Sequence, residues 1–166
     1  MMVLSKPEEC GNLCRVQILM QVIPTTHEAD ILVTAPEGRP LLVVEVKRLD
    51  FYQEARVQLA KYSQAVGAGF VMAVDPKQIL VAPTLDGLPQ WDRAITLPTS
   101  TIVRHYADVP NLERIEGFYL EALVEAWLRD FSFSWKSKRP PGYDELERIG
   151  LASRLQNSET HAQRSL

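Results

Sequence analysis

The side chains with the clearest capacity for chemistry are Asp30, Glu45 and Lys47. Glu45 and Lys47 end the run Leu41 to Lys47, which is apolar on both faces up to Glu45. In a central strand, an ionised carboxylate and an ammonium group cost several kcal/mol unless they are paired or bound to a metal. This placement favours a functional role. The alternative is an ion pair at a strand end, because Glu-x-Lys is a common tripeptide.

Asp30 is linked to this pair by a predicted hairpin. The turn residues 36–40 separate a strand at 29–34 from the strand at 41–47, so the two strands pair antiparallel. The start of the first strand then lies beside the end of the second, which makes Asp30 and Glu45 neighbours. Two adjacent carboxylates repel unless a cation lies between them, and with water oxygens they form the hard site that Mg²⁺ prefers. Taken alone, Asp30 could equally be a turn residue.

Side chains alternate across a strand, and this alternation predicts the two faces of the second strand. Leu42, Val44 and Val46 are expected on one face. The other face is expected to carry Leu41 and Val43 together with the charged pair.

An amphipathic helix is predicted after the hairpin. Apolar side chains recur at steps of three or four residues from Phe51 to Val66, and Gly67 ends the pattern. Gln58 and Tyr62 lie four residues apart on this apolar face. An amide on such a face needs a hydrogen-bonding partner, which a backbone group at the helix boundary could also supply.

The order and spacing of these residues resemble the PD-(D/E)XK nuclease superfamily, which has the restriction-endonuclease-like fold. The motifs are Asp30, then Glu45-Val46-Lys47 fifteen positions later, then Gln58-Leu-Ala-Lys-Tyr62 on the next helix. The Gln-x-x-x-Tyr helix is similar to branches related to RecB-type nucleases and type I restriction subunits. The resemblance covers about residues 15–82.

This resemblance implies an α/β fold with a mixed central sheet of four or five strands flanked by helices. It also implies Mg²⁺-dependent hydrolysis of phosphodiester bonds, with DNA as the expected substrate and Mn²⁺ as a possible substitute ion. Asp30, Glu45 and the backbone carbonyl of Val46 would hold the ion. Lys47 would orient the attacking water and stabilise charge on the phosphate, and the polar pair of the helix would position Lys47 or a backbone phosphate.

Two other functions stay open. Family members often carry a further acidic residue on a first helix, whereas only Glu8 and Glu9 are available here and Ala29 replaces the family proline before Asp30. A nucleic-acid-binding or interaction module of the same fold that has lost catalysis fits these departures, as a homo-oligomer or within a restriction or repair complex. In a third alternative the chain is unrelated and its Glu-x-Lys is a surface ion pair.

The rest of the sequence is expected to form further elements of the same domain. In the longest predicted helix Ile115, Tyr119, Leu123 and Trp127 recur every four residues, which indicates a helix packed on the domain. We expect one nuclease-like domain over residues 1–150, with a core at about 15–82, a helical part at about 99–150 and a frayed polar tail at 151–166. The expected elements beyond those above are strands at 15–23, 70–74 and 78–82 and helices at 100–106, 113–129 and 144–149.

The densest basic stretch, Trp-Lys-Ser-Lys-Arg, suggests a second contact with nucleic acid. Its cations could grip phosphates while bases stack on its aromatic ring, although most charge runs are solvated surface. The residues concerned are Trp135, Lys136, Lys138 and Arg139.

Composition excludes several other classes. The formal net charge of −3 gives no global attraction to nucleic acid, so any such partner must meet a local patch. Cys10 and Cys14 have no second Cys or His pair for a zinc site and are expected as thiols, and the three histidines are scattered. No apolar run is long enough for a membrane span, and we expect a cytoplasmic protein with no membrane partner.

Overall fold

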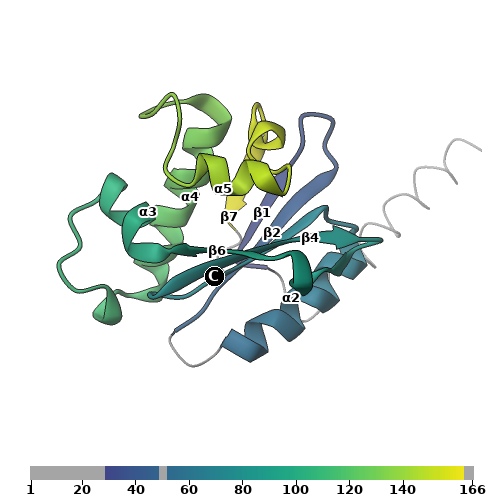
Figure 1. The fold of residues 1–166 in the computed structure, drawn as a ribbon, viewed down its shortest axis with the longest axis horizontal. Helices are drawn as coiled ribbons and strands as arrows, with labels where there is room; N and C mark the ends of the chain where they lie inside the picture. Colours follow the sequence, from purple (N-terminus) through teal and green to yellow (C-terminus); the bar gives the residue numbers. More distant parts are fainter. Residues whose placement is uncertain (1–28, 49–51, 163–166) are drawn as a thin grey trace, which may run out of the picture.

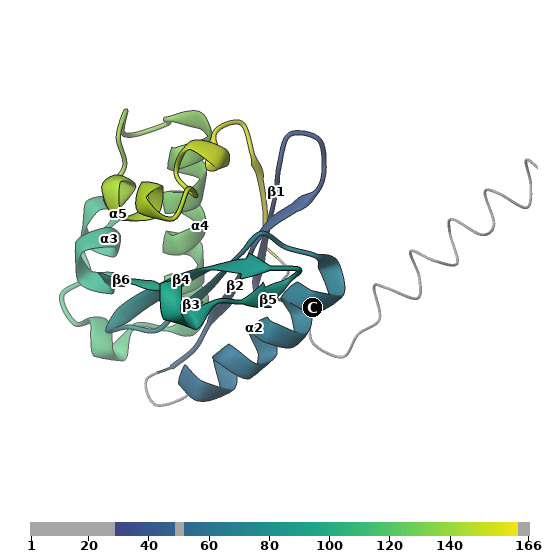
Figure 2. The same cartoon turned by 45° about the vertical axis from the view of Figure 1, so that its right-hand side comes forward.

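The computed structural model describes residues 29–48 and 52–162 (Figure 1). A mixed seven-stranded sheet lies between α2 on one face and α3, α4 and α5 on the other (Figures 1 and 2). The predicted α/β class with flanking helices is confirmed, and the sheet is larger than the four or five strands expected. The strands and α-helices are β1 (Ile31–Thr34), β2 (Pro40–Val46), α2 (Tyr52–Val66), β3 (Phe70–Val74), β4 (Gln78–Leu85), β5 (Leu88–Pro89), β6 (Ile95–Pro98), α3 (Thr99–Tyr106), α4 (Gly117–Phe133), α5 (Tyr143–Arg148) and β7 (Glu159–Ala162).

The strand order is β5-β4-β3-β2-β1-β7, with β6 also paired to β4. β1 and β2 form the predicted antiparallel hairpin, in which Ile31 lies opposite Val44. β2 and β3 run parallel, so their carboxyl ends lie at the same edge of the sheet. Residues that follow β2 and β3 therefore meet there.

The faces of β2 follow the predicted alternation with one exception. Leu42, Val44 and Val46 contact the larger core, which fills the space under α4, while Val43 belongs to a smaller core under α2. Leu41 was expected on the side of Val43, and this is wrong because it packs into the larger core. The pairing shifts between Val33 and Thr34, which leaves Leu41 as the extra residue of a β-bulge and turns its side chain.

α2 lies across β2 and β3 and confirms the predicted helix (Figure 2). Ala55 and Leu59 are fully buried against the sheet. The helix ends at Gly67, whose φ of 71° lies in the left-handed region that favours glycine. Ser63 Oγ donates to the Gly87 carbonyl oxygen at 2.6 Å, which joins the helix to the turn between β4 and β5.

The apolar stripe of α4 differs from the expected one. Tyr119 is exposed, whereas Leu120, Val124, Trp127 and Phe131 face the larger core. Counting every fourth residue drifts by about 40° per step around a helix of 3.6 residues per turn, so an every-four pattern leaves the buried face within a few steps. The helix also begins and ends about four residues later than predicted, at Gly117 and Phe133.

The C-terminal segment is part of the fold, which corrects the expectation of a frayed tail after residue 150. β7 pairs antiparallel with β1 at the edge of the sheet. Leu151 and Leu155 are fully buried in the larger core and anchor the chain before β7. Ser132 and Ser158 are hydrogen-bonded through their hydroxyl groups at 2.7 Å, so α4 also holds this segment.

Some predictions fall elsewhere in the chain. The strand at 15–23, Cys10, Cys14, Glu8 and Glu9 lie outside the described residues. Within the described residues, no helix is long and apolar enough to span a membrane.

Candidate functional site

The predicted acidic pair is brought together at the end of the hairpin. The register that places Ile31 opposite Val44 brings Asp30 beside Glu45. Asp30 Oδ2 accepts a hydrogen bond of 2.7 Å from the backbone N–H of Val46. The Glu45 carboxyl group, when protonated, donates to Asp30. The two side chains are therefore direct neighbours at the carboxyl edge of the sheet.

This pair carries an electrostatic cost. Glu45 is 5% exposed and lies opposite Ala73 on the α2 face. Burial, and then the charge of Asp30, raise the pKa of Glu45 to about 7, although Lys47 acts to lower it. Burial also raises the pKa of Asp30, and this effect outweighs its hydrogen bond from Val46 and the charge of Lys47. The site disfavours two negative charges unless a cation joins them.

Lys47 supplies one positive charge at this point. Its Nζ lies 3.4 Å from Glu45 Oε2, and its side chain is about a third exposed at 29%. Its backbone N–H donates to the Val74 carbonyl oxygen at 2.8 Å, which fixes the end of β2 against the end of β3. The three charged residues predicted from the sequence thus share one place.

Gln58 and Tyr62 are on α2, as predicted, and both are half-buried. Tyr62 packs against the smaller core. Gln58 lines a shallow groove on α2 together with Val57 and Lys61. Within residues 29–48 and 52–162, no side-chain hydrogen bond is recorded from Gln58 to the acidic pair, so its positioning role stays a prediction.

The donor set suits a hard divalent cation. Two carboxylates with water oxygens match the preference of Mg²⁺. Burial raises the pKa of Glu45 most, and the repulsion from Asp30 that adds to this rise is relieved by a cation between the two carboxylates. In the part of the chain that the structure describes, no group of three or more His, Cys, Asp or Glu side chains gathers in a metal-binding arrangement. Any ion at this site would be held by Asp30, Glu45 and the Val46 carbonyl.

The chain was also compared with known proteins. No protein-family model matches it, and neither curated proteins nor solved structures gave a match. Membership of the nuclease superfamily therefore stays a prediction from the motifs.

The basic segment, residues 135–139, follows α4, and several of its side chains contact α3 and α4. Lys136 Nζ donates to the His105 carbonyl oxygen, and the Trp135 Nε1–H donates to the Ala126 carbonyl oxygen at 2.9 Å. Arg139 pairs with Asp144. Trp135, Lys136 and Arg139 are thus each in contact with other groups of the protein, and Lys138 lines a neighbouring pocket. Their contact with nucleic acid stays a prediction.

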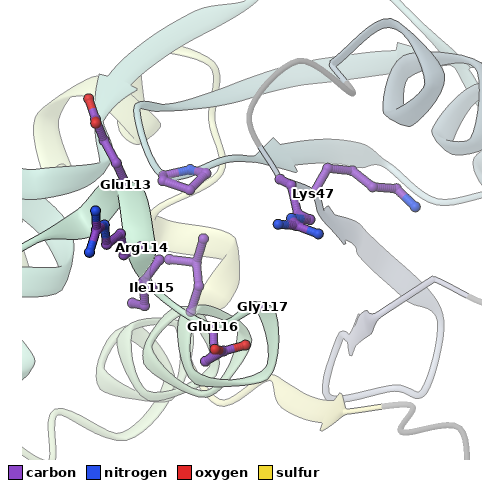
Figure 3. A pocket seen from close by; sticks show the side chains of 9 residues that line it. Lys47, Glu113, Arg114, Ile115, Glu116 and Gly117 are labelled. Atoms are coloured by element: carbon purple, nitrogen blue, oxygen red, sulfur yellow. The ribbon is translucent and has the colours of Figure 1, made fainter.

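No motif in the sequence indicates the cavity that borders Lys47. This cavity of about 370 Å³ lies at the carboxyl edge of β2 and β3. Figure 3 shows Lys47 across the opening from residues 113–117, with its side chain running away from that segment, in keeping with its ion pair to Glu45. Its walls come from segments far apart in the sequence, which are Lys47, Arg48, Pro76, residues 113–117 and Leu120.

Proposed function

We propose that this protein is a divalent-cation-dependent nuclease that hydrolyses phosphodiester bonds of DNA. The supporting observation is the placement of Asp30 beside Glu45 in a largely buried position, with Lys47 Nζ 3.4 Å from Glu45. Buried like charges are costly, and proteins retain such pairs most often at functional sites.

Each residue has a distinct task in this proposal. Asp30 and Glu45 hold the ion, with the Val46 carbonyl as a further oxygen ligand. Held there, Mg²⁺ would supply Lewis-acid polarisation of a phosphoryl oxygen and acidify a nearby water. Lys47 gives up its ion pair with Glu45 when Glu45 binds the ion. Its ammonium group then lies near the phosphate, where it stabilises the negative charge that develops during hydrolysis.

The hydrogen bond from Val46 to Asp30 supports this assignment in a second way. It fixes the Asp30 carboxylate through one oxygen, Oδ2, and leaves Oδ1 for another ligand. The same contact ties the carboxylate to the backbone of β2, so the geometry of the acidic pair is set by the hairpin.

A direct assay tests the proposal. The full chain is incubated with linear duplex, supercoiled and single-stranded DNA, each with Mg²⁺, Mn²⁺ or EDTA. We expect cleavage of at least one substrate with either metal and none in EDTA. Binding without cleavage under every condition would favour the catalytically inactive binding module, for which the mutual pairing of Glu45 and Lys47 is the supporting observation.

A further inference from the structure

The cavity beside Lys47 is the strongest unassigned feature of the described residues. It borders the candidate site through Lys47 and opens at the edge where β2 and β3 end. Its lining includes three cations, Lys47, Arg48 and Arg114, against two carboxylates, Glu113 and Glu116. Because Lys47 is paired with Glu45 and its side chain runs away from residues 113–117, the cations that this lining offers to a ligand are Arg48 and Arg114.

The cations of this lining remain accessible. Arg48 and Arg114 are both exposed, and their side chains are long enough to turn toward a ligand at the opening. In Figure 3 the Glu113 and Arg114 side chains both point away from Lys47, so Arg114 reaches a ligand at the opening by turning toward it. A phosphate group, with several acceptor oxygens, is the ligand that such a set of donors recognises.

An exposed aromatic residue follows the cavity-lining Gly117 in the sequence. Phe118 directly follows Gly117, which lines the cavity, and it is 76% exposed. Its neighbour Tyr119 is 40% exposed. A large aromatic ring in water offers a face on which an unpaired base can stack, and aromatic rings beside cationic grooves are typical of proteins that bind single strands.

We propose that this cavity and Phe118 form a binding site for single-stranded nucleic acid. Arg48 and Arg114 hold a backbone phosphate at the cavity, a base of the same strand stacks on Phe118, and the strand continues past Lys47 to the acidic pair. A duplex binds less well because its bases are stacked on one another and offer no free face to the ring. This inference rests on the proposed function, since it names the substrate class of that site.

Equilibrium binding tests the site without catalysis. A fluorescently labelled 20-nucleotide single strand and the matching duplex are titrated with the full chain in EDTA, at several salt concentrations. We expect the parent to bind the single strand at least about tenfold more tightly than the duplex. Phe118→Ala should weaken binding of the single strand by about fivefold or more, in line with the loss of one stacked base.

Matched control variants separate this site from general surface effects. Phe133→Ala removes a ring of similar exposure, 60%, from the other end of α4 and should leave the affinity unchanged. Arg48→Ala with Arg114→Ala should reduce the salt slope of binding by roughly 1.4, about 0.7 for each lost phosphate contact. Arg93→Ala with Arg148→Ala changes the net charge equally at two exposed positions outside the cavity and should leave the slope unchanged.

The outcomes distinguish this inference from the proposed function. Preference for the single strand together with loss on Phe118→Ala supports the inference, even if no cleavage is found with Mg²⁺. Cleavage by the parent that Phe118→Ala leaves intact, with unchanged affinity, overturns the inference and leaves the nuclease proposal standing. Absence of binding in EDTA, equal affinity for the duplex, or a larger loss from Phe133→Ala also overturns it.

Discussion

Two buried carboxylate sites in this molecule have opposite chemical environments. Asp130 on α4 is fully buried and accepts hydrogen bonds from the Tyr106 hydroxyl at 2.6 Å and from the backbone N–H groups of Lys136 and Ser137 at 2.9 Å each. Glu45 is also buried, but its neighbours are another carboxylate and one lysine. The first carboxylate is saturated with donors, and the second lies beside a like charge.

The pKa values of Asp130 and Glu45 are shifted in opposite directions. Burial acts to raise the pKa of Asp130, but the hydrogen bonds from Tyr106, Lys136 and Ser137 outweigh it and hold this pKa below its ordinary value. Burial and Asp30 instead raise the pKa of Glu45 to about 7. A carboxylate that the fold stabilises has a structural role, whereas a carboxylate that the fold destabilises is a candidate for binding a cation.

Under the proposed function, the largest expected effect is on the rate of cleavage. Glu45→Gln and Lys47→Ala should each lower the metal-dependent rate by about 10² to 10³, or roughly 3 to 4 kcal/mol, because each removes a ligand or a charge stabiliser. Asp130→Asn, assayed well below its melting temperature, should retain activity close to that of the parent. Initial rates on a labelled DNA substrate measure this, and full activity in Glu45→Gln or Lys47→Ala would remove that residue from the site.

For stability we expect the reverse order, with a larger loss from substitution of Asp130 than from substitution of Glu45. Asp130→Ala leaves three part-buried donors without their acceptor and should lower the free energy of unfolding by about 3 kcal/mol. Glu45→Gln removes a repelling charge and should leave the metal-free protein as stable as the parent or more so at pH 8. Urea unfolding in EDTA compares the two variants. A loss in Glu45→Gln as large as that in Asp130→Ala would make Glu45 a structural residue.

The two sites also differ in how far the sequence predicts them. The pairing of Asp30 with Glu45 follows from a short turn and from strand alternation, which are local features. The Asp130 network joins α3, α4 and the segment after α4, and the cavity beside Lys47 joins residues 47, 76 and 113–117. Such contacts depend on how distant segments pack, and no local pattern contains them.

The errors have equally specific causes. Leu41 changes face because a bulge adds one residue to β2, and a bulge in a short hairpin leaves little trace in the alternation. β7 has a polar sequence and forms because β1 offers it an open edge and because Leu151 and Leu155 anchor the segment before it. The register of an edge strand is decided by its partner, which lies about 125 residues away in this chain.

The pH dependence of stability should separate the two sites by sign. Below about pH 4.5 Glu45 is protonated in the folded and unfolded chain, and between about 4.5 and 7 only the folded chain keeps the proton, so stability from Glu45 is lost as pH rises through this window. The loss has a ceiling of roughly 3 kcal/mol. Asp130 contributes stability above its unfolded pKa that is lost as the pH falls.

Unfolding free energies of the parent and of Glu45→Gln in EDTA, measured from pH 4 to pH 8, test this sign. As the pH rises from about 5 to 8, the free energy of unfolding of Glu45→Gln should increase relative to that of the parent. The free energy of unfolding of Asp130→Asn should instead decrease relative to the parent as the pH rises out of the acid range. A constant difference between Glu45→Gln and the parent would mean that Glu45 titrates alike in the folded and unfolded chain.

The smallest expected effect concerns the metal itself and uses Asp30→Asn. The asparagine Oδ1 can still accept the hydrogen bond from Val46, so the structural contact is kept while a negative charge of the acidic pair is removed. In EDTA the variant should melt at the temperature of the parent or slightly above it, because repulsion with Glu45 is relieved. A structural aspartate would instead lose about 1 to 3 kcal/mol.

Millimolar Mg²⁺ then tests the same variant for binding. If the acidic pair binds the ion as proposed, a tenfold excess over the dissociation constant should stabilise the parent by about 1.4 kcal/mol and raise its melting temperature by roughly 3 to 5 °C for a chain of this length. Asp30→Asn should show little of this shift. Asp130→Asn should melt below the parent without Mg²⁺ and still show the full shift, because the Asp130 carboxylate is occupied by its own donors and does not hold the ion. If Asp30→Asn melts several degrees lower in EDTA and Mg²⁺ does not shift the parent, the carboxylate pair is structural like Asp130, and the difference between the two sites is one of pKa alone.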